Sequence, residues 1–269
     1  VEVVLRNQFH HAMSQRYGAV GGQGSKDWYA HVSLSSLSKA KIMDVTHYKR
    51  GNQLLPRVPA PSPDDVVSGL TFGFWPRLLD LTVDIHQQPV AWGPILVDVL
   101  PGHRQRQVSY WAKLKHRDAL FARLDLCNEL RNRIAHHEPI WKLGPLMVES
   151  RSRHGSPVAI QAPAPTTPAD ALSRLRTLYD RVIELLGWLS PAVAAKQQAS
   201  DMHLRCLNLL LIDTLRDYRR ALPPAEIDLA TVSNLRSLRK AFRYAARRKQ
   251  PVLIKDGHRL IGHLSCNTP

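Results

Sequence analysis

Residues 120–141, LFARLDLCNELRNRIAHHEPIW, are the stretch that decides the expected fold. At 100° per residue, their apolar side chains fall on one stripe of a helix, formed by Leu120, Leu124, Cys127, Leu130 and Ile134. No proline or glycine lies between Gly102 and Pro139, and proline disfavours helical geometry in the residue before it. The pattern therefore predicts one or two long helices over 104–136, ending near His136.

Arg131 falls within that apolar stripe, and burying a guanidinium without a partner is costly. One interpretation is a boundary arginine that reaches solvent or pairs with a structural carboxylate. The other is an arginine held for chemistry with Asn132 and His136, which share a neighbouring face. Arg131 and His136 are about 140° apart on an ideal helix. They converge only if the helix frays or ends near His136, or if a second copy supplies the other half.

These residue types suit RNA cleavage without a metal ion. Histidine titrates near neutrality and can move the proton of a 2′-hydroxyl, while arginine offers a fixed fork to phosphate oxygens. Asn132 can orient either group. His137 is equally consistent with packing and with a supporting role at the site.

Residues 131–136, RNRIAH, resemble the R-N-x-x-x-H signature of the HEPN superfamily of helical ribonucleases. Three other blocks narrow the resemblance: EVVLRN at 2–7, LTFGFWPRLL at 70–79 and LLGWLSP at 185–191. Together with LRNRIAHHEPIW, and in this order, they are similar to the bacterial Abi-like (abortive infection) family over about 190 residues.

The resemblance implies an all-α, HEPN-like helical bundle with metal-independent endoribonuclease activity. It implies a toxin of a phage-defence or toxin–antitoxin system, with a site completed in a homodimer. Arg131 and His136 are then the catalytic pair, Asn132 supports them, and Glu2 and Arg6 face the site from the first helix. The alternative for Glu2 and Arg6 is a surface i,i+4 ion pair. Members usually carry a helical segment before the EVVLRN block, so we expect the natural chain to extend before Val1.

Two parts are expected along the chain. Residues 1–220 form the helical domain, with a polar, Pro-rich connection around 51–63 and a long Pro/Ala-rich loop over 151–168. Residues 225–269 form a basic helix followed by a β-hairpin, because Asp256-Gly257 separates two short apolar runs. This tail is faintly similar to antitoxins of the Phd/YefM type, which pair with toxins and bind DNA.

The charge of the chain favours a polyanionic partner. Thirty-seven Lys and Arg against 22 Asp and Glu give a net charge of +15, which suits RNA before a membrane and equally suits an arginine-rich soluble protein. No apolar run approaches the roughly 18 residues of a membrane span. Three distant cysteines without a CxxC pair fit the cytoplasm. No cofactor or metal motif is present, so none is expected, and tryptophans such as Trp111 and Trp188 are interpreted as core residues.

Two other functions compete with the nuclease. One is a catalytically silent helical module that binds nucleic acid or a partner protein; the other is a regulator whose tail binds DNA. An arginine on a core stripe beside an ionisable histidine favours the enzyme, because a binding module has no need of it. An antitoxin or regulatory protein is a further expected partner.

Overall fold

The computed structural model describes residues 1–18, 25–142, 144–153, 155–219, 225–232, 234–248 and 252–264. They group into two compact units. Unit 1 comprises Val1–Pro165 and Leu178–Ala195, and unit 2 comprises Thr166–Thr177 and Lys196–Pro269. No helix of the described residues combines the length and the apolar character that a membrane crossing requires.

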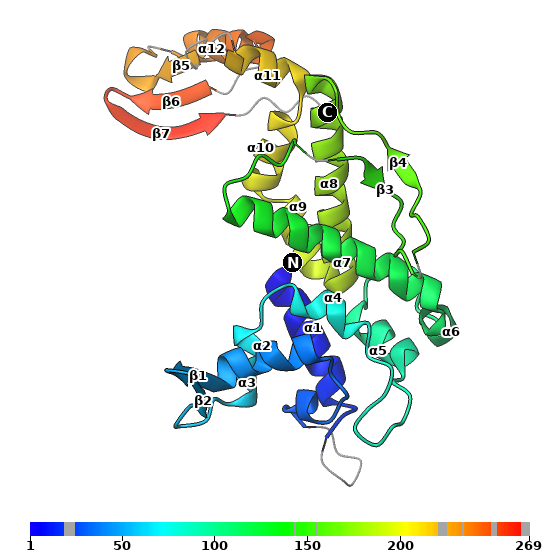
Figure 1. Ribbon diagram of the computed structural model, residues 1–269. Coiled ribbons are helices and arrows are strands. Elements are labelled where there is room, and N and C mark those ends of the chain that lie inside the picture. The colour runs from blue at the N-terminus through cyan, green and yellow to red at the C-terminus, as the bar shows by residue number, and fades with distance from the viewer. Residues whose placement is uncertain are drawn as a thin grey trace. The chain divides into compact units, whose positions relative to one another are not determined.

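Unit 1 is mainly helical (Figure 1). Its helices are α1 (Glu2–Ser14), η1 (Trp28–Ala30), α2 (Ser36–Thr46), α3 (Pro63–Gly69), α4 (Phe74–Leu78), α5 (Trp92–Val99), α6 (Val108–Ala112) and α7 (Leu114–Ala135). Its strands are β1 (His47–Arg50), β2 (Gln53–Pro56), β3 (Leu146–Met147) and β4 (Ile160–Ala162). Helices α8 (Pro168–Leu189) and α9 (Pro191–Gln198) contribute residues to both units.

One apolar core holds unit 1 together. On α1, Leu5, Phe9 and Met13 recur every four residues and are fully buried, and the Phe9 ring stacks on Trp75 of α4 at 5.9 Å between ring centroids. The same core contains buried side chains of the other helices, among them Phe74 and Leu78 of α4, Leu120 and Leu124 of α7, and Leu185 and Leu189 of α8. Three of the four sequence blocks, 2–7, 70–79 and 185–191, therefore contribute to this core, whereas Leu130 of the fourth lies in a smaller cluster with Leu146 and Leu178.

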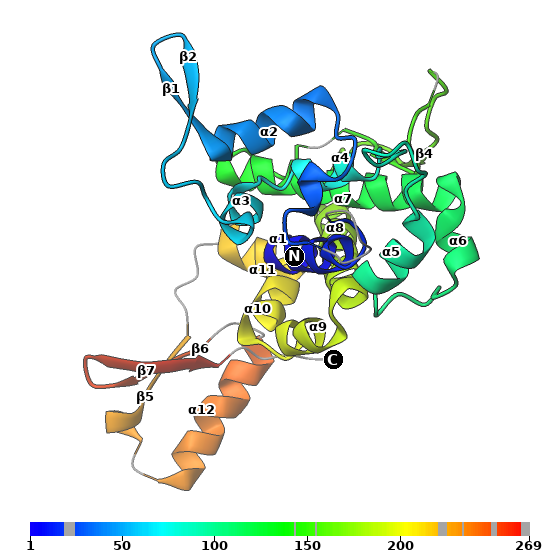
Figure 2. The same ribbon diagram turned by 90° about the horizontal axis from the view of Figure 1, so that it is seen from below.

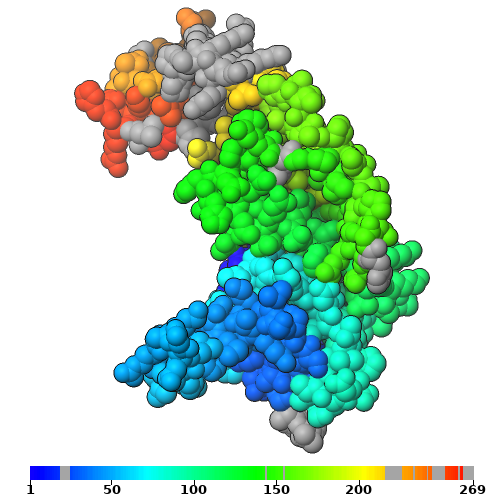
Figure 3. All heavy atoms as spheres, in the orientation of Figure 1, coloured from blue at the N-terminus to red at the C-terminus, as the bar shows by residue number. Residues whose placement is uncertain are grey.

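The expected all-α class is confirmed only as a mainly helical fold, because small sheets are also present. The connection expected around 51–63 begins as a hairpin in which β1 pairs antiparallel with β2, from His47 opposite Pro56 to Arg50 opposite Gln53. Gly51 has a φ of +61° in the turn, a conformation that glycine adopts without steric cost. The hairpin projects from α2 at the edge of unit 1 (Figures 2 and 3).

The long loop at 151–168 is anchored to the rest of unit 1. Arg153 donates from Nε to both carboxylate oxygens of Asp118 on α7, at 3.0 and 2.8 Å. Arg151 makes a two-point ion pair with Asp80, and its guanidinium carbon lies 3.8 Å from the Phe121 ring centroid. The strand pair β3–β4 also lies at this loop. These contacts attach the segment to the first half of α7.

The loop between α5 and α6 approaches α8 very closely at Gly102. The Gly102 amide donates to the carbonyl of Trp188 at 2.9 Å. A Cβ atom built on Gly102 would lie 2.0 Å from the carbonyl oxygen of Gly187. Only glycine fits this contact, which sets the position of the following residue, His103, against Trp188.

Unit 2 contains the expected helix and hairpin together with a further strand. Its remaining elements are α10 (Asp201–Leu209), α11 (Ile212–Arg219), β5 (Ala225–Asp228), η2 (Leu229–Thr231), α12 (Leu235–Arg248), β6 (Val252–Asp256) and β7 (Arg259–Leu264). The predicted hairpin is β6–β7, and Gly257 in its turn has a φ of +58°. Strand β5, which was not predicted, pairs parallel with β6, and Val252 and Ile227 form a small core with Leu238 of α12.

The division into units differs from the predicted boundary between residues 220 and 225, of which 220–224 lie outside the described residues. Helix α10 contacts α11 within unit 2. Burial raises the pKa of the Cys206 thiol on α10, and the charge of Arg176 on α8 opposes that rise. The first part of α8 and all of α10 belong to the same unit as the tail.

Candidate active site at the end of α7

Helix α7 ends in a hydrogen-bonded cap formed by the two histidines and Glu138. The amide of His137 donates to the carbonyl of Ile134 at 3.2 Å, and the amide of Glu138 donates to the carbonyl of Arg133 at 2.8 Å. This pair of bonds is the Schellman arrangement, in which the residue after the C-cap is left-handed and is usually glycine. Here His137 takes that position, with a φ of 56°. The predicted helix end near His136 is confirmed.

The cap keeps His136 in helical register. Its amide still donates to the carbonyl of Asn132 at 2.9 Å, and the helix continues through Ala135. The side chains of Arg131 and His136 therefore leave one helix about 140° apart. Ending the helix does not bring the two together within one chain, and no hydrogen bond or ion pair joins them in the described structure.

Arg131 is half exposed, at 49% of its side-chain surface, and so does not occupy a buried stripe. Its placement on a core-facing stripe is wrong, because the buried stripe ends at Leu130 and Ile134 is 60% exposed. The structure instead shows the boundary arginine of the first interpretation, which reaches solvent beside a carboxylate. The Arg131 Nε atom lies 3.7 Å from Oε2 of Glu2, and one terminal nitrogen donates to Oδ1 of Asn132 at 3.3 Å. Both contacts are long, and an exposed ion pair at such a distance contributes little to stability. The guanidinium therefore retains donors for a phosphate.

Glu2 and Arg6 have different surroundings, although both lie on α1. Glu2 lies against Arg131, as expected for a residue that faces the site from the first helix. Arg6 donates to the carbonyl of Ser68 on α3 at 2.7 Å. The alternative of a Glu2–Arg6 ion pair is wrong, because each side chain takes a different partner. The contact from Glu2 joins the start of α1 to the end of α7.

Charges at the end of α7 are nearly balanced. The Arg133 guanidinium lies 3.3 Å from a carboxylate oxygen of Glu129 and 3.6 Å from one of Glu138. A helix C-terminus is also the electronegative end of the helix dipole, which disfavours anions. A phosphate would therefore be held by arginine side chains, in competition with their glutamate partners.

The imidazole rings of His136 and His137 are exposed, and neither makes a hydrogen bond or an ion pair with any described residue. Burial raises the pKa of the nearby Cys127 thiol to about 11, so this cysteine carries almost no thiolate at neutral pH and is no nucleophile. Within the part of the chain that the structure describes, no group of three His, Cys, Asp or Glu side chains has the arrangement of a metal site. The polar side chains at this helix end thus include the exposed Arg131, His136 and His137 and the half-buried Asn132.

The left-handed conformation of His137 leads to a test of its role. A side chain other than glycine in this region is strained by about 1 kcal/mol. We expect His137→Gly to leave the free energy of unfolding unchanged or to raise it by up to about 1 kcal/mol, whereas His137→Val lowers it by about 1–2 kcal/mol. Urea denaturation followed by circular dichroism measures both. A glycine variant less stable than the valine variant would contradict the observed cap.

Fold and site together define a mainly helical protein whose helix α7 presents an arginine, an asparagine and two histidines at its exposed end. Comparison of the chain with protein-family models, curated proteins and solved structures finds no match.

Proposed function

We propose that this protein is a metal-independent endoribonuclease of the HEPN, Abi-like type, acting in the cytoplasm as the toxin of an abortive-infection or toxin–antitoxin system. The observation that carries the proposal is the set formed by the exposed Arg131 and His136 and the half-buried Asn132 at the capped end of α7. Three of the four blocks that resemble this family share one core, which supports it. An antitoxin or regulatory protein is the partner that such a toxin requires.

The chemistry follows from the residue types. The imidazole of His136 takes the proton of a 2′-hydroxyl, whose oxygen attacks the adjacent phosphorus. Arg131 holds the charged oxygens of the phosphorane, and Asn132 fixes the guanidinium. The 5′-oxygen leaves with a proton from a second histidine. The products are a 2′,3′-cyclic phosphate and a 5′-hydroxyl.

A second copy of the chain would bring an Arg131 and a His136 side chain close together. Because Arg131 and His136 diverge on one helix, a two-fold axis beside the end of α7 would place the arginine of one copy near the histidine of the other. Ile134 lies between them in the sequence and is 60% exposed, so it offers an apolar contact for such an interface.

The nuclease proposal is tested by incubating the purified full chain with total RNA in EDTA and sequencing the ends. We expect cleavage that persists in EDTA and leaves 2′,3′-cyclic phosphates, with a bell-shaped pH profile near neutrality. RNA that stays intact with and without divalent metal, or cleavage that EDTA abolishes, would contradict the proposal.

The dimer is tested with a matched pair of isoleucines. Ile134 and Ile160 are both 60% exposed, but only Ile134 lies at the end of α7. We expect Ile134→Lys to lower self-association and RNA cleavage together by about 10-fold or more, because the lysines of two copies would repel one another at a two-fold contact. The added positive charge does not by itself repel RNA. Light scattering and the cleavage assay measure the two quantities, and Ile160→Lys is the control. A monomeric wild-type chain that cleaves RNA fully would refute the composite site.

A catalytically silent nucleic-acid-binding protein is the second candidate. The observations that favour it are the ion-paired arginines at the end of α7 and a basic face on α12. On that helix Arg236, Arg239, Lys240 and Arg243 are exposed at positions i, i+3, i+4 and i+7. Such a protein would bind RNA or DNA with strong salt dependence and leave RNA uncut in the assay above.

A further inference from the structure

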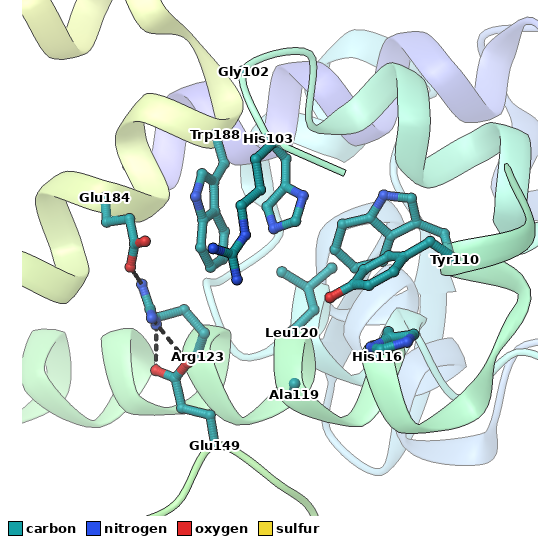
Figure 4. Close-up of a pocket in the computed structure, with 12 residues that line it drawn as sticks. Gly102, His103, Tyr110, His116, Ala119, Leu120, Arg123, Glu149, Glu184 and Trp188 are labelled. Carbon is teal, nitrogen blue, oxygen red and sulfur yellow. Dashed lines mark hydrogen bonds and ion pairs between the residues drawn. The ribbon is translucent and has the colours of Figure 1, made fainter. Parts of the chain in front are cut away.

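Unit 1 contains a cavity of about 400 Å³ at the start of α7, close in size to the smaller ligand pockets of proteins (Figure 4). Its aromatic walls come from Tyr110 and Trp111 on α6 and from Trp188 on α8, and His103 lies between them. The sequence predicts that these tryptophans are core residues. Trp111 is buried, but Trp188 is only partly buried, and both line the cavity.

The close contact at Gly102 builds this cavity. It brings His103 against α8, so that the imidazole meets Trp188 edge-on at 4.7 Å and Trp111 at 4.8 Å between ring centroids. On the opposite side, Tyr110 stacks on His116 of α7 with an interplanar angle of 15°. Figure 4 shows the His103 ring between Trp188 and Tyr110, above Leu120. The walls are therefore flat aromatic surfaces held by neighbouring elements.

His103 presents its Nε2 atom to this cavity. The side chain is buried, with the residue 7% exposed. Its Nδ1 lies 3.0 Å from the amide nitrogen and 3.3 Å from the carbonyl oxygen of Gln105. Burial lowers the pKa of His103, which favours the neutral ring. A neutral imidazole has one donor and one acceptor nitrogen, and Nε2, which has no partner among the described residues, forms a hydrogen bond with a base in either tautomer.

The other polar groups that line the cavity are an ion-paired cluster around Arg123 and the exposed side chain of Arg104. The Arg123 guanidinium lies 4.7 Å from the Trp188 ring centroid and is held by both carboxylate oxygens of Glu149 and by Oε2 of Glu184. Arg123 is thus neutralised within the protein, while the half-exposed Glu184 keeps its Oε1 as an acceptor. Arg104, which also lines the cavity, is exposed and carries a positive charge.

We propose that this cavity binds a purine nucleotide. The base would lie against the aromatic walls, where His103 Nε2 forms a hydrogen bond with a polar group on the edge of the base and Glu184 accepts from an N–H of the base. Arg104 would pair with the phosphate at the mouth. A purine fits better than a pyrimidine because it covers more of the aromatic surface.

The nucleotide site is separate from the proposed nuclease site. Ala119 and Leu120 line the cavity, whereas His136 lies about 16 residues further along α7, which is roughly 24 Å at 1.5 Å per residue. Binding at this cavity does not depend on RNA cleavage. The two proposals can therefore fail independently.

Calorimetric titration of the full chain tests the proposal with GMP and AMP, their nucleosides and ribose 5-phosphate. We expect one purine nucleotide per chain, weaker binding of the nucleoside, which lacks the phosphate, and no binding of ribose 5-phosphate. Competition by a short oligonucleotide with unpaired purines would assign the base to an RNA strand, and its failure to compete would assign it to a free nucleotide. No binding of any nucleotide or oligonucleotide at millimolar concentration would overturn the proposal, as would equally tight binding of ribose 5-phosphate.

Substitutions of residues that line the cavity test where the nucleotide binds. We expect Tyr110→Leu to weaken GMP or AMP binding by roughly 5-fold to 100-fold, the range that loss of one stacking contact gives. Tyr48→Leu, at an exposed tyrosine of β1, is the matched control and should bind normally. His103→Gln removes the ring nitrogen from its position and should also weaken binding, so the proposal stays testable if Tyr110→Leu unfolds. His136→Ala should bind normally. Equal affinity of the Tyr110, His103 and Tyr48 variants would place the nucleotide elsewhere and overturn the proposal.

Discussion

Replacing His136 with alanine is expected to lower the rate of RNA cleavage by about 10² to 10⁴, the usual loss when a general acid–base is removed. His136 is exposed beyond the last residue of α7, and its ring has no partner in the described structure, so the free energy of unfolding should stay nearly unchanged. His86→Ala removes another exposed histidine of unit 1 and should cleave at the wild-type rate. Single-turnover cleavage assays and urea denaturation measure the two effects.

Replacing Arg131 with alanine should lower the rate of RNA cleavage as much as replacing His136, but for a different reason. Its guanidinium would bind phosphate oxygens at two points, and lysine cannot reproduce this geometry. We therefore expect Arg131→Lys to lose most of the activity that Arg131→Ala loses, whereas Arg50→Ala, at an exposed arginine of β1, loses none. Wild-type activity in both the His136 and Arg131 variants would remove these residues from the site, whatever the activity of the protein.

Gly102→Ala is expected to lower the free energy of unfolding by about 3 kcal/mol or more. The new methyl group would lie 2.0 Å from a backbone carbonyl oxygen, which cannot move aside as a flexible side chain can. The loop would have to leave α8 and give up the hydrogen bond from Gly102 to the Trp188 carbonyl. Urea denaturation followed by tryptophan fluorescence measures the change.

Gly187, on the other side of the same contact, is the matched control. A Cβ atom there meets only Ala194 at 3.9 Å, an ordinary contact, and alanine is favoured over glycine inside a helix by about 1 kcal/mol. Gly187→Ala should therefore be neutral or stabilising. Equal stability of the Gly102→Ala and Gly187→Ala variants would mean that the loop does not approach α8 as described.

Local periodicity predicted the helices of unit 1 well. The spacing of Leu5, Phe9 and Met13 and that of Leu120, Leu124 and Cys127 each correspond to a buried face. Burial follows such spacing because a helix has one period and one core-facing side. The hairpin at 47–56 was missed, although its Gly51-Asn52 turn between two short segments is a sequence signal for one.

The exposure of Arg131 was not predictable from the stripe alone. A helical wheel gives the direction in which a side chain leaves its helix. It does not show how far along the helix the neighbouring elements cover that face. The core covers α7 only as far as Leu130, so Ile134 and Arg131 face solvent although they continue the pattern. The cavity beside His103 was missed for a related reason, because it depends on a contact between residues 102 and 188, far apart in the sequence.

The middle and the last turn of α7 differ in what restrains them. Around its middle, Arg123 is bound by Glu149, Glu184 and the carbonyl of Arg181, whereas the last turn has exposed side chains and long ion pairs. Local opening is cheapest where few buried contacts are lost, so backbone amides of the last turn should exchange with deuterium sooner than those near Arg123. The last turn of α7 can therefore change its conformation around a phosphate at small energetic cost, while the rest of the helix stays fixed.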